Sequence, residues 1–277
     1  MGVVNITPDS FSDGGLFLDP EAAVAHALRL LDEGADLLDL GAESTRPGSR
    51  AGGTAEAVTV SAEDEQARLM PVLEGILKAR PDAIVSVDTY KAATARAALE
   101  AGVEIVNDVS GFTWDAEMAS VCAAFGAGVV LMHTRGRPDE WRAQPQLAPD
   151  ALMKMVREGL AGIHAAAQAA GIPSEAIVLD PGYGFGKRFD ENYALLARQT
   201  ELLELGSPLL AGVSRKSFLG HTLAELSCGE VSMEARDTAS LAAMTAAILR
   251  GASIVRVHAV RPAVEAARIA DAILNAS

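Results

Sequence analysis

Residues that can bind a charged or hydrogen-bonding ligand follow nearly every β-rich segment of this sequence. They are carboxylates, amides, imidazoles, hydroxyls and cations: Asn5, Asp39, Asp88, Asn107, Asp108, His133, Asp180, Ser214, Arg215, Lys216, Arg256 and His258. In a barrel of parallel strands, the carboxyl ends of all strands emerge on one face. These side chains are therefore expected to meet at one mouth, although they are scattered along the chain.

Any one of these residues also has a structural explanation. Asp and Asn after a strand commonly cap helices or make turns. Asp39 could be structural because it precedes the last strand residues, and Asp108 because it can cap a turn toward Ser110. Taken together, buried carboxylates, amides and a lysine are costly unless a ligand or each other satisfies them. The set as a whole therefore predicts a binding site.

The donors and acceptors of this set suit a planar heterocycle with several N–H groups. Asp88 and Asp180 would accept those hydrogen bonds, while Asn107 and Lys216 would meet a ring nitrogen and a carbonyl oxygen. A pterin has this layout.

An anion site is predicted beside it. Arg256 and His258 alternate with Val257, so both side chains point to one face of the last strand, where a guanidinium and an imidazole could hold a diphosphate. The alternatives are an ion pair of Arg256 with a helix carboxylate and a purely structural His258.

The elements that must position these residues alternate along the chain. Short β-rich runs, each separated from the next by a plausible helix, lie near residues 2–5, 36–41, 83–88, 104–107, 128–132, 176–180, 208–213 and 253–257. Asp19-Pro20 resembles a helix start, and Gly34, Gly102 and Gly171 lie where helices should stop. The pattern predicts an α/β fold, a (β/α)₈ TIM barrel forming one domain over residues 1–277; an open doubly wound sheet is the structural alternative.

Three connections are too long to be simple turns. Residues 7–19 and 42–61 are rich in Gly, Ser, Thr and Pro, and they are expected to act as lids over the mouth or to be surface insertions. Residues 134–149 form the third, with Trp141 as its expected anchor.

Composition excludes several classes of partner. The 277 residues carry a formal net charge of -14, which disfavours nucleic acid and anionic membranes. Two cysteines in no CxxC pair suggest neither structural zinc nor a disulfide framework. With no signal-like start and no apolar run long enough to span a bilayer, the chain is expected to be soluble and cytoplasmic.

The whole chain resembles the dihydropteroate synthases. Eight blocks carry the resemblance in order: NITPDSFSDGG from Asn5, GAESTRPGS from Gly41, SVDTYK from Ser86, IVNDVSG from Ile105, LMHTRG from Leu131, LDPGYGFGK from Leu179, GVSRKSFLG from Gly212 and IVRVH from Ile254. The resemblance implies a (β/α)₈ transferase of folate synthesis. It would condense 6-hydroxymethyl-7,8-dihydropterin diphosphate with 4-aminobenzoate, and sulfonamides would mimic the latter.

The resemblance also implies roles for single residues. The catalytic set would be Lys216, Arg256, His258 and Asp88, and the pterin would contact Asp88, Asn107, Asp180, Lys216 and Arg256. The diphosphate would contact Asn5, Thr45, Arg256 and His258. Aminobenzoate would contact Thr45, Arg46, Pro47, Phe185 and Ser217. Asn5 matches the position associated with Mg²⁺, the implied cofactor. Family members are commonly homodimers, and the Ala-rich helices expected at 234–250 and 262–274 could supply that interface.

Two departures from the family pattern keep alternatives open. Ala259 stands where the family often has an aspartate, and the second long connection carries an apparent insertion near residues 50–59. A non-catalytic pterin-binding relative is therefore one alternative. The other is a pterin-dependent methyltransferase acting on a corrinoid, which should lack the blocks at Thr7–Ser10 and Ser214–Ser217 that this chain carries.

Overall fold

The computed structural model describes residues 1–7, 19–44, 60–226 and 231–276. Within them, eight parallel strands pair in the order of the sequence, so each helical connection leads to the neighbouring strand. The strands are β1 (Gly2–Asn5), β2 (Leu37–Gly41), β3 (Ile84–Asp88), β4 (Ile105–Asp108), β5 (Gly128–Met132), β6 (Ile177–Asp180), β7 (Leu209–Ala211) and β8 (Ala252–Val255).

The sheet closes between β8 and β1. The Val3 amide donates to the Val257 carbonyl at 3.0 Å, the Val257 amide donates to the Met1 carbonyl at 2.9 Å, and Gly2 pairs in parallel with Val257. Closure removes the free edges that an open doubly wound sheet would keep. The predicted barrel is therefore confirmed, with β7 and β8 shorter than the sequence suggested.

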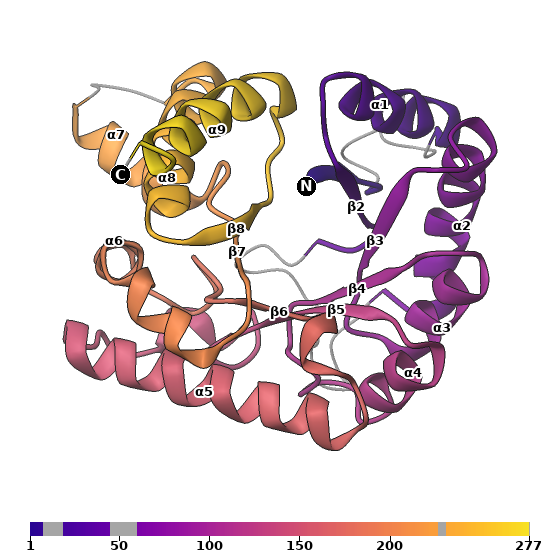
Figure 1. Ribbon diagram of the computed structural model, residues 1–277, viewed down its shortest axis with the longest axis horizontal. Helices are drawn as coiled ribbons and strands as arrows, with labels where there is room; N and C mark the ends of the chain where they lie inside the picture. Colours follow the sequence, from indigo (N-terminus) through magenta and orange to yellow (C-terminus); the bar gives the residue numbers. More distant parts are fainter. Residues whose placement is uncertain (8–18, 45–59, 227–230, 277) are drawn as a thin grey trace.

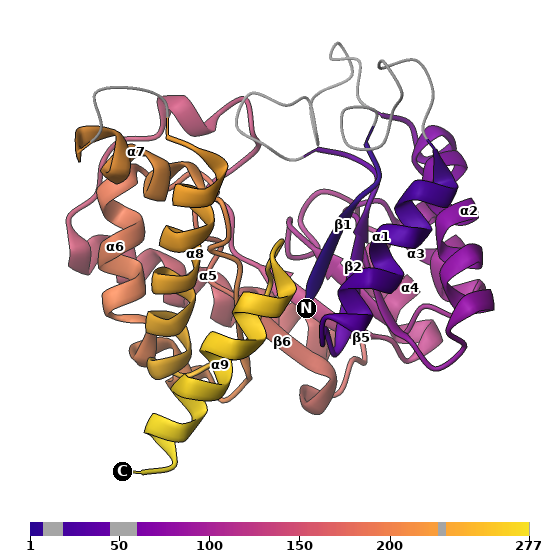
Figure 2. The same cartoon turned by 90° about the horizontal axis from the view of Figure 1, so that it is seen from above.

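Helices form a ring outside the strands (Figure 1), and they run alongside them in the perpendicular view (Figure 2). Their bounds are α1 (Pro20–Asp32), α2 (Ala62–Ala79), α3 (Ala92–Glu100), α4 (Met118–Phe125), α5 (Pro149–Ala169), α6 (Phe189–Ala197), α7 (Ser217–Leu226), α8 (Met233–Leu249) and α9 (Val260–Leu274). Short 3₁₀ turns are η1 (Trp141–Ala143), η2 (Ser174–Ala176) and η3 (Gln199–Leu205). No described helix is both long and apolar enough to cross a membrane.

Helix ends follow the sequence signals. Asp19 Oδ1 accepts from the amides of Glu21 and Ala22 at 2.9 and 3.2 Å and so caps α1. Gly34, Gly102 and Gly171 follow their helices with φ of 102°, 104° and 96°, a region that favours glycine. These local signals fix where each helix gives way to the next strand.

The inside of the barrel has an apolar floor beneath a polar mouth. The floor is a cluster of Met1, Leu37, Ile105, Val130, Val178, Leu210 and Ile254. Side chains two residues apart on a strand point to the same face. Asp39, Asn107, Asp180 and Arg256 each stand two positions after a floor residue and therefore belong to the mouth.

Candidate active site

Arg256 lies at the centre of the mouth and contacts two carboxylates. Its Nε is 2.5 Å from Oδ2 of Asp39, and its Nη2 is 2.7 Å from Oδ2 of Asp88. Asp39 is fully buried at 0% exposure. The alternative of an ion pair with a helix carboxylate is wrong, because both partners come from strands β2 and β3.

Asn107 joins the same group from β4. Its Nδ2 donates to Oδ2 of Asp39 at 3.0 Å, and β-sheet register places it directly beside Asp88. One carboxylate oxygen of Asp39 thus accepts from both an amide and a guanidinium, which fixes the orientation of each. Three neighbouring strands therefore present a rigid polar surface toward the mouth.

The protonation of Asp88 is finely balanced. Burial raises the pKa of Asp88 to about 7, while the charge of Arg256 opposes that rise and Asp39 adds to it. Burial by itself would lower the pKa of Arg256, but the two carboxylates raise it above its ordinary value, so Arg256 keeps its proton. A ligand that donates N–H groups to Asp88 would favour the ionised carboxylate.

The opposite side of the mouth holds Asp180 and Lys216. Oδ1 of Asp180 accepts from the Gly182 amide at 2.7 Å, and burial raises the pKa of this carboxyl despite nearby Lys216. Burial lowers the pKa of Lys216 to about 8, with Asp180 opposing that shift. The Lys216 ammonium lies 3.9 Å from the centre of the Phe185 ring, a cation–π contact.

His258 is held by Ser214 after β7. Nδ1 of His258 lies 3.0 Å from the Ser214 hydroxyl, which also accepts from the His258 backbone amide at 3.3 Å. If the hydroxyl donates to Nδ1, the ring proton lies on Nε2; if Nδ1 carries the proton, the hydroxyl accepts from it. Burial, reinforced by Arg256, lowers the pKa of His258 to about 3, so the imidazole is neutral.

A magnesium ion would find few protein ligands here. No group of three or more His, Cys, Asp or Glu side chains among the described residues could hold a metal. Asn5 ends β1 with a half-buried carboxamide, in register with Gly41. One amide oxygen fits an ion that is bound mainly by substrate phosphates and water, as Mg²⁺ commonly is.

Three residues expected at the mouth lie elsewhere. His133 packs against α5, so closely that a Cβ on Gly159 would be 2.5 Å from its ring. Arg215 turns outward and pairs with Asp237 on α8 at 2.6 Å. Asp108 caps a turn by accepting from the amides of Ser110 and Phe112, as its structural interpretation proposed. The expectation that every strand-end residue meets at one mouth is therefore wrong.

A second network adjoins the mouth and was not predicted. The carboxylate of Glu65 on α2 accepts from the hydroxyls of Thr89 and Thr94 at 3.1 and 2.7 Å, and Lys91 pairs with both Glu65 and Glu43. These contacts hold the segment that follows Asp88. The only sequence signal was the acidic first turn of α2, which is ordinary for a helix start.

Of the expected aminobenzoate contacts, Phe185 and Ser217 are described. Phe185 packs edge-on against Trp141, with ring centres 5.1 Å apart, so Trp141 anchors the third long connection as predicted. Ser217 is exposed at the start of α7, next to Lys216. Thr45, Arg46 and Pro47 lie outside the described residues, as do most of both expected lids.

Comparison with known proteins shows the family to which this chain is similar. Residues 1–258 match the model of the pterin binding enzymes. The chain is 42% identical over 279 residues to the dihydropteroate synthase of Mycobacterium leprae, covering 100% of this chain and 93% of that protein. It is 40% identical to the mitochondrial folate synthesis bifunctional protein of Pisum sativum but spans only 53% of it.

Solved structures agree in fold. The dihydropteroate synthase of Xanthomonas albilineans with 4-aminobenzoic acid superposes with a TM-score of 0.86 at 40% identity, covering 99% of this chain and 92% of that one. The same enzyme in complex with 7,8-dihydropteroate gives a TM-score of 0.83 at 39% identity with the same coverage.

Proposed function

Since this chain belongs to the pterin-binding enzyme family, among its dihydropteroate synthases, we propose that the mouth around Arg256 holds 6-hydroxymethyl-7,8-dihydropterin diphosphate while 4-aminobenzoate attacks it. The reaction is a transfer: the pterin's methylene carbon leaves the diphosphate and joins the arylamine. The products are 7,8-dihydropteroate, a folate precursor, and diphosphate.

The pterin is assigned to the two sides of the mouth. Asp88 and Asp180 accept from its N–H groups, Asn107 and Lys216 meet its ring nitrogen and carbonyl oxygen, and Arg256 borders its edge. The observation that carries this assignment is the pair of ion pairs from Arg256 to Asp39 and Asp88, which holds two carboxylate acceptors at different depths of the mouth. Asp39 acts through Arg256 and Asn107.

The diphosphate is assigned to the rim, with Asn5, Thr45, Arg256 and His258 around it. In the tautomer that carries its proton on Nε2, neutral His258 would donate a hydrogen bond to the diphosphate, and Arg256 would supply positive charge. Asn5 would hold Mg²⁺, which, when bound, neutralises charge that develops on the departing diphosphate. The half-buried carboxamide of Asn5 at the end of β1 supports that role.

Departure of the diphosphate is proposed to precede attack by the amine. The C–O bond breaks and its electron pair leaves with the diphosphate, so the methylene carbon and the pterin ring share a positive charge. The carboxylates of Asp88 and Asp180 stabilise that charge through the ring N–H groups. The amine nitrogen then forms the new C–N bond and loses a proton to solvent, and no nucleophilic side chain is needed.

Aminobenzoate is assigned to the wall made by Phe185 and Ser217, together with Thr45, Arg46 and Pro47. Phe185 offers a ring face held between Lys216 and Trp141, which suits a planar aromatic acid. A sulfonamide is expected to compete for the same wall.

One assay tests the proposed reaction. The purified protein is mixed with Mg²⁺, the dihydropterin diphosphate and 4-aminobenzoate, and both products are measured. Pterin binding without dihydropteroate would overturn the proposal in favour of a non-catalytic binding protein, and methyl transfer to a corrinoid would favour the methyltransferase. Diphosphate release in the absence of aminobenzoate is expected from the proposed order, and strict dependence on the amine would contradict that order.

A homodimer through the last helices is also proposed. Three apolar side chains on the last helices are exposed: Leu249 on α8 by 38%, and Ile269 and Ile273 on α9 by 64% and 52%. A partner surface would remove this apolar area from water. Light scattering should give twice the chain mass, and Ile269→Glu with Ile273→Glu should give a monomer. The cytoplasmic location stays a prediction.

A further inference from the structure

Lys187 is a buried lysine whose ammonium group donates hydrogen bonds to three backbone carbonyls. Its Nζ donates to the carbonyls of Gly182, His133 and Phe185 at 2.8, 3.0 and 3.3 Å, and the residue is 6% exposed. An ammonium group has three N–H donors. All three are therefore matched, and within the described part of the chain no carboxylate forms an ion pair with it.

The three carbonyls belong to two different loops at the mouth. His133 directly follows β5, whereas Gly182 and Phe185 belong to the loop after β6. That loop packs so closely on β5 that a Cβ on Gly182 would lie 2.0 Å from the His133 carbonyl oxygen. Lys187 thus holds together two backbones that touch without a side chain between them.

The loop after β6 has little stiffness of its own. Gly182, Gly184 and Gly186 have φ of 71°, 85° and 71°, and glycine loses more conformational entropy on folding than any other residue. Yet this loop supplies the amide that binds Asp180 and the Phe185 ring beside Lys216. Side-chain hydrogen bonds, first of all those of Lys187, must therefore fix both groups.

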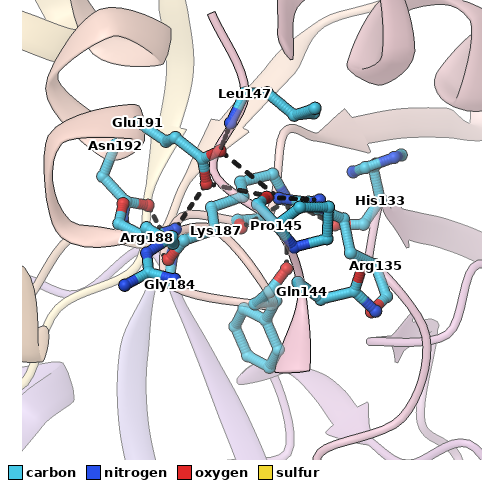
Figure 3. Close-up of polar contacts among 12 residues, drawn as sticks. His133, Arg135, Gln144, Pro145, Leu147, Gly184, Lys187, Arg188, Glu191 and Asn192 are labelled. Carbon is cyan, nitrogen blue, oxygen red and sulfur yellow. Dashed lines mark hydrogen bonds and ion pairs between the residues drawn. The ribbon is translucent and has the colours of Figure 1, made fainter. Parts of the chain in front are cut away.

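Asn192 on α6 is the second such contact. Its Oδ1 accepts from the Gly184 amide at 2.7 Å, and its Nδ2 donates to the carbonyls of Lys187 and Arg188 at 3.2 and 2.7 Å. The residue is 1% exposed. Its carboxamide thus links the middle of the glycine-rich stretch to the residues that follow it (Figure 3).

Glu191 extends the same network to the loop after β5. It pairs with Arg135 at 3.3 Å and accepts from the amides of Leu147 and Arg188 at 2.7 and 2.5 Å. Figure 3 shows these contacts beside those of Lys187. Glu191 and Arg135 are both buried, so the base of α6 is a fixed support.

We propose that Lys187 is a positioning residue of the active site. With Asn192, it holds the loop after β6 so that the Gly182 amide meets Asp180 and the Phe185 ring lies beside Lys216. The inference rests on the proposed roles of Asp180 in pterin binding and Phe185 in aminobenzoate binding, and it adds the groups that place them.

The electrostatics of Lys187 agree with this geometry. Burial lowers its pKa to about 7, although Asp180 opposes the shift. A neutral amine would offer two N–H groups to three carbonyls. The three hydrogen bonds of Lys187, rather than an ion pair, therefore explain how this buried lysine is stabilised.

The test compares Lys187→Met with the wild-type protein. Methionine keeps most of the side-chain volume and removes the three donors. The KM for 4-aminobenzoate should rise about tenfold, and the Kd for a pterin without diphosphate, measured by fluorescence titration, should rise about threefold. Rates are divided by the concentration of active sites from that titration, so loss of folded protein does not enter.

Lys154→Met is the matched control, since Lys154 is 73% exposed on α5 and should leave both constants unchanged. Lys187→Arg keeps charged donors and should recover part of the loss. A Lys187→Met protein with a lower melting temperature but unchanged KM and Kd would overturn the inference, because its role would then be structural only.

Two further outcomes are decided by other measurements. If Lys187→Met does not fold, Asn192→Ala replaces it, and an unchanged KM for aminobenzoate there overturns the inference. If the wild-type protein makes no dihydropteroate, the proposed reaction fails, while the pterin titration of Lys187→Met still reports whether Lys187 positions the Asp180 side of the mouth.

Discussion

Arg256 joins two carboxylates that stand at different depths of the barrel. Asp39 lies mid-strand in β2, paired in register with Ser86, whereas Asp88 ends β3 two residues further on. One guanidinium therefore spans both levels with separate nitrogens. Arg256 thus balances the negative charge of Asp39 deep in the barrel, while Asp88 stays near the opening of the mouth.

Asp39→Asn should destabilise the protein and impair catalysis. The substitution keeps the shape of the side chain but leaves Arg256 with one carboxylate, so the free energy of unfolding should fall by about 3 kcal/mol. The value of kcat/KM should drop at least tenfold. Urea denaturation and steady-state rates measure the two effects, with Asp36→Asn, an exposed acid just before the same strand, as the control. Equal behaviour of the two variants would contradict the role of Asp39.

Lys216→Arg should remove a limb of the pH profile. The pKa of Lys216 is lowered to about 8, so the ammonium is present below that pH and is lost above it. Wild-type kcat/KM should then fall about tenfold per pH unit above pH 8. Arginine stays charged, and the variant, although slower, should show no such fall up to pH 10. An unchanged limb would assign it to another group.

His133→Gln should flatten the acid side of the stability curve. Burial lowers the pKa of His133 from 6.5 to about 2, so below pH 6.5 the unfolded chain binds a proton that the folded protein does not. The unfolding free energy attributable to His133 therefore falls by about 1.4 kcal/mol per pH unit below that point. Urea titrations at pH 4 to 7 should show that the wild-type curve is steeper by this amount. Parallel curves would refute the assignment.

Gly182→Ala and Gly171→Ala form a matched pair. Both glycines have positive φ, 71° and 96°, but a Cβ at Gly171 meets nothing within 4 Å, whereas one at Gly182 meets the His133 carbonyl. Gly171→Ala should cost about 1 kcal/mol of unfolding free energy, and Gly182→Ala more than about 3 kcal/mol. Only Gly182→Ala should weaken pterin binding. Similar losses in both would exclude a steric cause.

Removal of divalent metal should separate binding from turnover. EDTA is expected to abolish formation of dihydropteroate, because charge on the departing diphosphate is no longer neutralised. A pterin without diphosphate should bind with unchanged Kd, since its proposed contacts are Asp88, Asn107, Asp180, Lys216 and Arg256. Loss of that binding in EDTA would place the metal within the pterin pocket.

The fold was predictable because its signals are local and repeated. Each strand is a short β-rich run, and most helices have a capping residue or a glycine at one end, as at Asp19 and Gly34. The eight strand–helix units could be predicted from local sequence alone, but the closure of the barrel could not. Closure depends on Met1 and Val257 pairing across the whole chain length, which no local pattern indicates.

The site was only partly predictable because position in the sequence does not show whether a side chain points into the barrel or away from it. Counting back from the strand ends chose Asp88, Asn107, Asp180 and Arg256, which do face the mouth. The same counting chose His133, which follows Met132 and so takes the opposite face, and it undervalued Asp39, which lies in phase with the floor residue Leu37. Phase within each strand, set by the apolar floor, was the missing criterion.

Lys187 shows a further limit. The sequence placed it only within the LDPGYGFGK block, and the residue types around it assigned it no role. Its actual partners are three carbonyls from two loops, and backbone groups leave no trace in residue types.

The apolar floor also determines how strongly the mouth interacts with what it binds. Because Leu37, Ile105, Val178 and Ile254 fill the barrel below the charged groups, bulk water can screen those groups only from the open side. A planar ligand seated over Asp39 and Arg256 closes that side. The effective dielectric constant around the charges then falls, and each Coulombic contact becomes stronger once the ligand is in place.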